Sequence, residues 1–263
     1  MRWLTGAASD LPAQPVTPLV STATTVPQLL AALAASDPGR PRLTWYDDAP
    51  GPTCGERIEL SARVLANWVA KAANLLVDEL DVEPGDRVVI ELPTHWRAGY
   101  WMLAAWSAGA EVLVGGRPQD ARVLVTDSPA AAPKGPVVVA VTLPALARSW
   151  AGVPLPSGAV DEAAAVTGQP DLFEPFTEPD GAAPALTVGN ISLLYDELLA
   201  SARGVAQAQG WQVGARVLTS AGPGAAVAAL LAPLCVDGSL VLVRDPDPDL
   251  IDQRRQDERV TNA

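Results

Sequence analysis

The turn Ser220-Ala-Gly-Pro-Gly224 carries residue types that could bind an anion. It falls between a predicted strand and a predicted helix, where exposed backbone N–H groups and the positive end of the helix dipole attract phosphate. Ser220, Gly222 and Gly224 are therefore candidate cofactor-binding residues. Gly and Pro are also the usual residues of a plain tight turn, and that second interpretation is the one we favour.

His95 is the sole histidine, and it stands between the Leu92-Pro93 turn and a helix predicted from Trp96. A histidine at a helix N-terminus can act as an acid or a base because the helix shifts its pKa. The sequence offers it no Ser/His/Asp spacing and no G-x-S-x-G turn, and one histidine cannot build a His-rich metal site. We expect a structural role for His95 and predict no catalytic residue.

Three carboxylates at a spacing of two, in Asp245-Pro-Asp-Pro-Asp249, suggest calcium at first sight. The intervening prolines and the missing Gly and Glu depart from an EF-hand loop, so a solvated acidic stretch is expected. Cys54 and Cys235 have no metal-ligand spacing. Two thiols in an intracellular α/β protein are usually reduced, with a single disulfide as the alternative. We predict no metal site.

The net charge of −12 over 263 residues limits the partners that this chain can bind. Nucleic acids and anionic membranes attract clustered Lys and Arg, so we expect neither to be a partner. Lys71 and Lys134 are the two lysines of the sequence, which weakens any mechanism that handles phosphate with a lysine. The length and an apolar content of 49% suffice for one large core or for two domains.

Two apolar stretches, 98–116 and 225–243, have the length of membrane spans. Each is interrupted by a glycine close to an acid, and a buried helix followed by a buried strand accounts for both better. The N-terminus lacks a basic segment followed by an apolar one, so we expect no signal peptide. These patterns predict a cytoplasmic protein without membrane contact.

A stretch of sequence occurs twice: 81–93 is echoed by 211–223, with Gly85 matching Gly214. Each copy continues into an Ala-rich helical stretch, a second glycine and an apolar strand. Shared spacing over this length indicates a duplicated supersecondary unit, and two copies are too few for a solenoid. We predict one α/β domain with two pseudo-symmetric halves, in which Gly109 and Gly238 are equivalent.

Hydrophobic periodicity and turn residues predict the other elements. Helices are expected over 26–35, 61–80, 96–107, 193–209 and 225–235, and strands over 42–46, 56–60, 87–92, 111–114, 122–126, 136–141, 215–220 and 239–243. Continuous apolar runs are typical of parallel strands buried on both faces. Strands that alternate with crossover helices predict a three-layer α/β/α fold with a mostly parallel sheet.

The domain boundaries follow from composition. We expect a loose, Pro/Thr/Ala-rich arm over 1–25, one domain over 26–244 and a charged tail over 245–263. Within the domain, halves at about 43–141 and 187–244 are joined by a loop-rich segment, 151–190, which is dominated by Pro, Gly, Asp and Glu. The eight tryptophans are expected to fill the core.

Several short motifs occur in a fixed order along the two copies. They are Leu43-Thr-Trp45, Val82-Glu-Pro-Gly-Asp-Arg-Val88, Leu92-Pro93, Ala108-Gly-Ala110 and Leu230-Leu-Ala-Pro-Leu-Cys-Val-Asp-Gly-Ser-Leu-Val-Leu242. In this order they resemble the N-terminal part of the adenylate-forming enzymes, which include acyl-CoA synthetases, firefly luciferase and the adenylation domains of peptide synthetases. The chain also resembles small actinobacterial proteins of this kind, and its Lys-poor, Ala- and Arg-rich usage suits a high-GC genome.

The resemblance implies a Ser/Thr/Gly-rich phosphate loop ending in Pro-Lys-Gly just before the helix of the second copy. The nearest match is Thr177-Glu-Pro-Asp-Gly-Ala-Ala-Pro-Ala185, in which Ala185 stands at the lysine position. Its two carboxylates would repel a polyphosphate by about 1 kcal/mol or more per charge pair. Thr177 and Gly181 are candidate residues of a degenerate phosphate loop.

Two further family features are absent from the expected places. The aromatic-His pair that the resemblance implies after the first strand of the second copy is replaced by Ser220–Gly224, without a histidine. The adenine-binding motif, the ribose-binding Asp and the C-terminal domain with its catalytic Lys belong to later parts of the family's sequence. We therefore expect no acyl-adenylate formation by the family route.

Three hypotheses follow. The first is a non-catalytic relative that acts as a binding or interaction module and needs no cofactor. In full-length relatives one flank of this domain packs on the rest of the enzyme, so we expect a homodimer or a protein partner to cover that flank here. The second is a protein that binds ATP, AMP or an acyl group at a rebuilt site, for which the nearby sequence offers Arg203 and Arg216 as cations. The third is a subunit that completes a separate catalytic chain.

Overall fold

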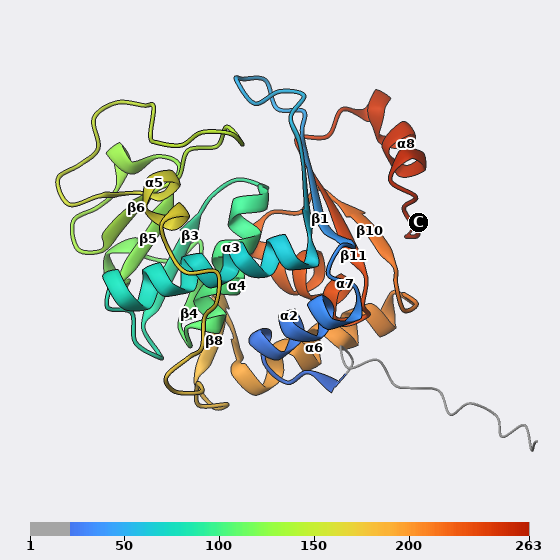
Figure 1. The fold of residues 1–263 in the computed structure, drawn as a ribbon, viewed down its shortest axis with the longest axis horizontal. Helices are drawn as coiled ribbons and strands as arrows, with labels where there is room; N and C mark the ends of the chain where they lie inside the picture. The colour runs from blue at the N-terminus through green and yellow to red at the C-terminus, as the bar shows by residue number, and fades with distance from the viewer. Residues whose placement is uncertain (1–21, 263) are drawn as a thin grey trace, which may run out of the picture.

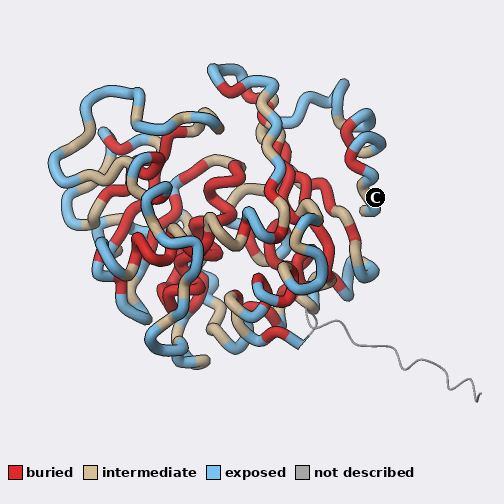
Figure 2. Tube along the Cα trace, viewed as in Figure 1, coloured by how far each residue is buried: buried red, intermediate tan, exposed pale blue. Residues whose placement is uncertain are grey.

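The computed structural model describes residues 22–262, and most of the expected N-terminal arm, residues 1–21, lies outside them. The described chain forms two β-sheets with a layer of helices between them (Figure 1). The buried parts of the chain trace follow the strands of both sheets and the helices that separate them (Figure 2). One continuous hydrophobic core joins the two sheets through these helices.

The larger sheet has seven strands. In spatial order they are β7 (Val160–Asp161), β6 (Val137–Ala140), β5 (Val123–Thr126), β3 (Arg87–Glu91), β4 (Glu111–Val114), β8 (Pro184–Val188) and β9 (Ile191–Leu194). All neighbours are parallel except β8 and β9, which form an antiparallel hairpin at one edge. The continuous apolar runs of β3 and β5 are buried, as expected for parallel strands.

The smaller sheet has four strands, in the order β10 (Arg216–Thr219), β11 (Ser239–Arg244), β1 (Pro41–Asp47) and β2 (Arg57–Ser61). The strands β10, β11 and β1 are parallel, and β2 is antiparallel to β1. The predicted strand bounds agree with those of both sheets to within one residue or two, except that the sequence predicted neither β7 nor the β8–β9 hairpin.

Helices fill the space between the sheets. They are α2 (Val26–Ser36), α3 (Ala62–Asn74), α4 (Trp96–Ser107), α6 (Tyr195–Ala208) and α7 (Ala232–Cys235). Side-chain caps fix two of their starts, because Thr25 accepts the Gln28 N–H of α2 and Ser61 accepts the Val64 N–H of α3. Single π-helical turns extend α3 over Leu75–Glu79 and precede α7 over Val227–Leu231.

Helix α4 lies at the centre of the molecule and contacts strands of both sheets. All twelve of its residues are buried, so it shows no polar face. Trp96, Trp101 and Trp106 are each no more than 2% exposed, which confirms that they belong to the core. This burial explains why the stretch 98–116 reads as a membrane span: it contains a wholly buried helix and the strand β4. No helix within residues 22–262 is long and apolar enough to cross a bilayer.

The fold class is confirmed as α/β with a mostly parallel sheet, but the layers differ from those expected. The sequence predicted a single sheet shared by both copies, covered by helices on its two faces. In the structure, β3–α4–β4 of the first copy belongs to the seven-stranded sheet and β10–α7–β11 of the second to the four-stranded sheet. The helices share the space between two sheets because each copy packs its helix toward the other copy.

The duplication itself is visible in the pairing of the strands. Arg87 of β3 lies opposite Glu111 of β4, and Arg216 of β10 lies opposite Ser239 of β11, both in parallel register. Counting back from these pairs makes Gly109 equivalent to Asp237, which shares its left-handed backbone (φ 80° and 53°). The expected equivalence of Gly109 and Gly238 is therefore wrong by one residue.

The joining segment and the tail contain more structure than their composition suggested. Segment 151–190 holds β7, the short helix α5 (Glu162–Thr167) and β8. The tail contains helix α8 (Pro248–Asp257), which Asp247 caps by accepting the Asp249 N–H. Because Arg254 and Glu258 are each less than a tenth exposed, this tail is not simply a solvated end.

Candidate functional site

The turns that follow equivalent strands of the two copies meet face to face. Thr94, which directly follows Leu92-Pro93 after the first strand, donates its hydroxyl to the carbonyl of Ser220 at 3.1 Å. A side chain at Gly224 would touch Val188 and Val114, so the turn also lies against the carboxyl ends of β8 and β4. Because ligands of parallel α/β sheets bind at the carboxyl edge, this junction is the candidate site.

The structure brings Ser220, Gly222 and Gly224 together at this junction, but two amides in and next to the turn are already engaged. The Ala221 N–H is donated to the Thr219 hydroxyl at 3.1 Å, and the Ala225 N–H to the Gly222 carbonyl at 3.0 Å. A 3₁₀ turn, Pro223–Ala225, and the π-helical turn follow in place of a regular α-helical N-terminus. These bonds are those of a tight turn.

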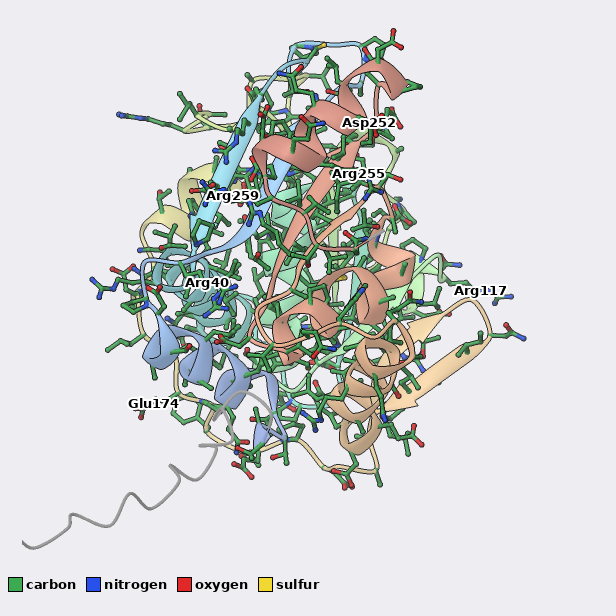
Figure 3. The ribbon with its side chains drawn as sticks, turned by 90° about the vertical axis from the view of Figure 1, so that its right-hand side faces the viewer. Arg40, Arg117, Glu174, Asp252, Arg255 and Arg259 are labelled. Atoms are coloured by element: carbon green, nitrogen blue, oxygen red, sulfur yellow. The ribbon has the colours of Figure 1, made fainter. Side chains whose placement is uncertain are left out.

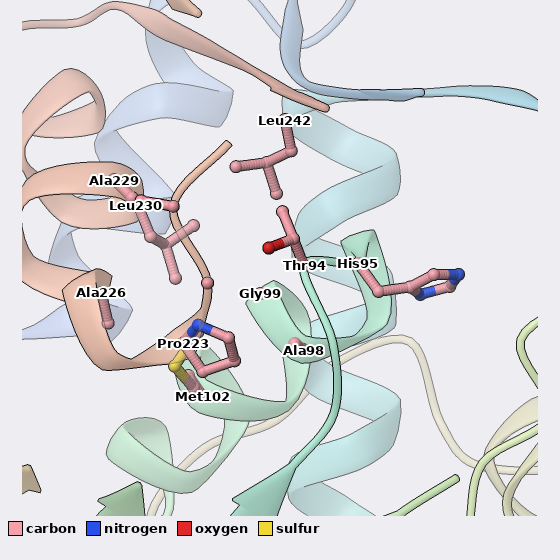
Figure 4. A pocket seen from close by; sticks show the side chains of 12 residues that line it. Thr94, His95, Ala98, Gly99, Met102, Pro223, Ala226, Ala229, Leu230 and Leu242 are labelled. Carbon is pink, nitrogen blue, oxygen red and sulfur yellow. The ribbon is translucent and has the colours of Figure 1, made fainter. Parts of the chain in front are cut away.

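A small pocket opens between the two turns (Figure 4). Its walls are mainly apolar, with Met102 and Ala98 of α4 on one side and Pro223, Ala226 and Leu230 on the other. Its free volume of about 20 Å³ holds roughly one water molecule. None of the described residues that line it is ionised, since His95 is neutral. A nucleotide therefore needs the two turns to separate before it can enter.

His95 lies beside this pocket as a buried cap, only 1% exposed. Its Nδ1 accepts the Arg97 N–H at 3.1 Å at the start of α4, and its Nε2 lies 3.1 Å from the Leu143 carbonyl. Together these partners require the neutral tautomer with hydrogen on Nε2. Burial, followed by the charge of Arg97, lowers the pKa of His95 well below its ordinary value. The Trp45 ring packs against it with centroids 4.2 Å apart and planes tilted by 60°, so its role here is structural.

The degenerate phosphate loop lies at the wrong edge of the sheet. Thr177 and Gly181 precede β8 and so lie at the amino end of this parallel strand, away from Ser220. A Cβ at Gly181 would collide with the Asp196 carboxylate, so the backbone there is packed against an acid. Ala185, at the position of the family lysine, is fully buried within β8 and accepts the Trp106 indole N–H at 2.8 Å. The two candidate sets, Thr177 with Gly181 and Ser220 with Gly222 and Gly224, therefore do not form one site.

The loop that does follow the carboxyl end of β8 is the Gly189-Asn190 turn of the β8–β9 hairpin. Two residues cannot wrap a polyphosphate as a longer glycine-rich loop does. The two cations considered for a phosphate site also lie elsewhere. Arg203 donates to the Ala23 carbonyl at 2.9 Å, and Arg216 pairs with Glu258 on the far face of the small sheet.

A buried charged cluster escaped the sequence analysis. Arg97 of α4 donates to both carboxylate oxygens of Glu162 at 2.9 and 3.0 Å, and the Tyr100 hydroxyl donates to the same carboxylate. Both ionic side chains are at most 2% exposed, and the Arg97 guanidinium stacks on Trp96 at 4.4 Å. Burial raises the pKa of Glu162 to about 7, while Arg97 acts in the opposite direction. An arginine inside an otherwise apolar helix was the signal that could have revealed it.

The acidic stretch and the cysteines have structural surroundings. Asp247 caps α8, and Asp245 adopts a left-handed backbone with φ 43°, so their carboxylates do not converge. Among residues 22–262 there is no cluster of three or more His, Cys, Asp or Glu side chains that could hold a metal. Cys54 is exposed and Cys235 is buried, and neither forms a disulfide.

Known proteins resemble this chain both in sequence and in fold. No family model matches the chain. It is 37% identical over 246 residues to a TIGR03089 family protein of Mycobacterium tuberculosis (strain ATCC 25618 / H37Rv), and the match covers 89% of this chain and 96% of that protein. The fold matches the crystal structure of a Brucella canis acyl-CoA synthetase with a TM-score of 0.71 at 20% identity.

The structural match covers 89% of this chain but 46% of the synthetase, so this chain spans less than half the length of that enzyme. At this level of identity the likeness concerns the fold. It confirms that the chain shares the fold of an acyl-CoA synthetase, which is the fold that the motifs of the two copies indicated. The site that could carry the chemistry has to be judged from the residues of this chain.

Proposed function

The chain belongs to the TIGR03089 family, and we propose that it is a binding or interaction module that uses an acyl-CoA synthetase-like fold without adenylate chemistry. The observation that carries this proposal is the closed carboxyl edge. Thr94 bonds to Ser220 across the place where a ligand would enter, and the pocket between them has room for about one water molecule. No ionised side chain among the residues 22–262 that line this pocket offers a charge to a phosphate.

The electrostatics at the carboxyl edge favour the same conclusion. A phosphate site of this fold class needs N–H groups or cations aimed at the ligand. At β8 the loop is the short Gly189-Asn190 turn, and Arg203 and Arg216 are engaged elsewhere. With a net charge of −12, the chain repels nucleotide phosphates as well as nucleic acids and anionic membranes. We therefore propose a cytoplasmic protein that requires no nucleotide cofactor.

An exposed apolar patch supports a role in protein association. Leu172 and Phe176 are 84% and 89% exposed, and they lie in one loop. Cavities of about 200 Å³ on each side of Pro27 adjoin this loop, lined by α2, α3, α6 and the end of α4. Apolar surface of this kind usually marks an interface. A homodimer or a protein partner that covers the patch is part of the proposal.

Thermal shift with ATP/Mg²⁺, AMP and a non-hydrolysable acyl-adenylate analogue tests the nucleotide side of the proposal. A ligand at about 100 times its Kd stabilises a fold by about 2.7 kcal/mol, which is several degrees for a chain of this size. We expect no shift with any of the three. A saturable shift that Gly222→Val abolishes would replace this proposal with the second candidate below. Leu146→Ser, at a side chain that is 91% exposed and does not line the pocket, is the control for that variant.

The second candidate is a protein that binds an acyl group, or a nucleotide, between the two turns. The specific observation in its favour is the apolar wall of Met102, Leu230 and Leu242, which suits a hydrocarbon chain if the Thr94–Ser220 bond opens. An acyl-CoA synthetase-like subunit that completes another chain would also keep this wall. Protection of Met102 from oxidation by an added fatty acid distinguishes this candidate from the first.

A further inference from the structure

Within the charged tail, residues 248–262 cover one face of the four-stranded sheet, and in this subsection the tail means these residues. Figure 3 shows α8 lying across this face, with Asp252 and Arg255 along its length. Beneath it, Leu218, Val241 and Val243 are less than a tenth exposed. They pack against Ile251 and Val260 of the tail and against Tyr46 of β1. Removal of the tail therefore uncovers an apolar sheet face.

The tail also occupies the outer edge of β10. The Thr261 N–H is donated to the Arg216 carbonyl at 2.8 Å, and the Arg216 N–H to the Thr261 hydroxyl at 2.9 Å. The side-chain amide of Asn262 then imitates a peptide group, since it accepts the Leu218 N–H at 2.9 Å and donates to the Leu218 carbonyl at 3.3 Å. An edge without this cover would be a template for pairing with another chain.

Ion pairs hold the tail as well as apolar contacts do. The Arg254 guanidinium contacts both carboxylate oxygens of Asp48. Glu258 accepts bonds from Arg57 and Arg216, and from the Tyr46 hydroxyl. The carboxylates of Asp48 and Glu258 are each 6% exposed, and loss of the tail would separate Asp48 from Arg254 and Glu258 from Arg57 and Arg216. The charged groups on the sheet side, Asp48, Arg57 and Arg216, are therefore complementary to Arg254 and Glu258 of the tail.

The connection between β11 and α8 is short and strained. Three residues, 245–247, join the end of the strand to the first residue of the helix. Asp245 takes a left-handed backbone with φ 43°, and Pro246 and Pro248 restrict the chain on both sides of Asp247. A hinge that is short and strained in the closed chain favours exchange of the segment that follows it.

We propose that two copies of this chain exchange their tails, so that the tail of each copy covers the β10–β11 face of the other. A second copy is the partner that fits, because its tail brings the same Arg254, Glu258 and Asn262 to the same places in the same order. Every contact of the closed chain is then made between copies, while the hinge at Asp245 extends. Simple opening leaves the apolar face and Asp48 exposed, whereas reciprocal exchange covers both again and relieves the hinge. This inference goes beyond the proposed function and does not depend on it.

Charge reversal tests the exchange directly. Asp48→Arg places two arginines opposite each other, and Arg254→Asp places two aspartates there. The tail of either variant is therefore repelled both from its own chain and from an identical copy. When the two variants are refolded together, an exchanged heterodimer satisfies both sites, one as Asp48–Arg254 and the other with the charges reversed. We expect native mass spectrometry to show a 1:1 heterodimer with wild-type protection of the Leu218 amide in hydrogen exchange. The double variant that carries both reversals in one chain serves as the control and is expected to dimerise like wild type.

The outcomes that overturn the proposal are equally specific. A wild-type chain that remains monomeric at 100 µM by light scattering contradicts it. So does a mixture of the two variants in which the Leu218 amide stays unprotected while the double variant is protected. A dimer that forms in both single variants as readily as in wild type uses another surface and overturns the exchange as well.

The hinge gives a second test for the case in which the reversed variants fail to fold. Asp245→Gly removes the cost of the left-handed backbone in the closed chain, so it should weaken the dimer by about tenfold. Asp81→Gly is the matched control, because Asp81 is also an aspartate with a left-handed backbone (φ 50°) but lies outside the hinge. We expect Asp81→Gly to leave the dimer dissociation constant unchanged. An equal effect of both variants, or of neither, contradicts the exchange.

Discussion

The two copies of the β-helix-β unit share a register and differ in what their helices have to do. In the first copy α4 is a regular helix, buried on all sides, whose start carries His95 and Arg97. In the second copy a 3₁₀ turn and a π-helical turn replace most of the helix, and α7 has four residues. The comparison shows that one supersecondary unit can serve as the centre of a core or as a compact wall, depending on the side chains between its two strands.

The copies also differ where the helix returns to the second strand. In the first copy the left-handed position is Gly109, followed by Ala110; in the second it is Asp237, followed by Gly238. Asp237 tolerates this backbone and binds buried Arg42 at 2.7 Å, which ties the second copy to β1. Each copy thus solves the same turn with different residues, and the variants below test how far they are interchangeable.

The largest effect is expected from Gly238→Ala. An added Cβ would lie 2.3 Å from the Ala215 carbonyl oxygen and 2.6 Å from the Pro233 carbonyl oxygen, and backbone atoms cannot move aside easily. We expect the free energy of unfolding to fall by about 3 kcal/mol or more, measured by urea denaturation. The equivalent position of the first copy already carries the methyl group of Ala110. Ala110→Gly is therefore the control, with an expected loss of about 1 kcal/mol.

A smaller effect is expected from replacing Trp106 or Trp101 of α4, whose indole N–H groups differ in whether they have a hydrogen-bond partner. Trp106 donates to the Ala185 carbonyl at 2.8 Å, whereas Trp101 has no partner for its buried Nε1. Trp106→Phe leaves the carbonyl unpaired and should cost about 1–3 kcal/mol beyond the packing change. Trp101→Phe removes an N–H that already lacks a partner, so its cost should be lower by about 1 kcal/mol. Equal costs in urea denaturation would show that the Trp106 bond contributes nothing.

The pH dependence of stability should lie with the first copy, because His95 and Glu162 surround the start of α4. The pKa of His95 is lowered, so the unfolded chain takes up a proton below about pH 6.5 and stability falls as the pH falls. The pKa of Glu162 is raised from 4.5 to about 7, so stability falls as the pH rises through that window. The two slopes oppose each other in wild type, and each is at most about 1.4 kcal/mol per pH unit.

Single variants separate these slopes. His95→Asn keeps a side-chain cap for α4 and removes the titration of the histidine, so stability should then fall from pH 4.5 to 7. Glu162→Gln removes the other group, so stability should rise over the same range. Denaturation curves at half-unit steps of pH measure both. If the two variants keep the wild-type profile, other groups control the pH dependence.

The smallest effect is expected where the two copies touch. Thr94→Val removes the hydroxyl that bonds to the Ser220 carbonyl and should cost about 0.5–1.5 kcal/mol. Thr94→Ser keeps the hydroxyl and should cost less. Because this bond closes the pocket, Thr94→Val should also speed hydrogen exchange around Ser220. Unchanged exchange in Thr94→Val would mean that the turns do not hold each other closed.

Local structure was largely predictable because periodicity and turn residues act over short distances. The helix 96–107 and the strand 111–114 were predicted with the bounds that the structure shows. The assignment of the copies to different sheets was not predictable, because buried apolar runs such as those of β3 and β11 fit either sheet equally well. The equivalence of Gly109 with Asp237 was missed because Asp adopts a left-handed backbone more often than most residues other than glycine do.

At the candidate site, too, local structure was predictable and contacts between distant segments were not. The turn Ser220–Gly224 lies where the strand–turn–helix pattern placed it, at a carboxyl edge. The phosphate loop was predicted at Thr177–Ala185 because the residue types there resemble the family's loop. That segment leads into the amino end of β8, whereas the Ser220–Gly224 turn lies at the carboxyl edge. The hairpin turn after β8 was missed because the sequence between 184 and 194 gave no strand prediction. The Arg97–Glu162 pair joins residues 65 apart, and no local pattern reports such contacts.

Hydrogen–deuterium exchange with and without saturating ATP/Mg²⁺ and the acyl-adenylate analogue tests the central claim most directly, because it reads the two facing turns themselves. If the carboxyl edge is closed to nucleotides, exchange in the peptides that contain Thr94–Gly99 and Ser220–Ala226 stays the same in all three states. Protection of both peptides by either ligand would contradict the account and identify the junction of the two copies as a working nucleotide site.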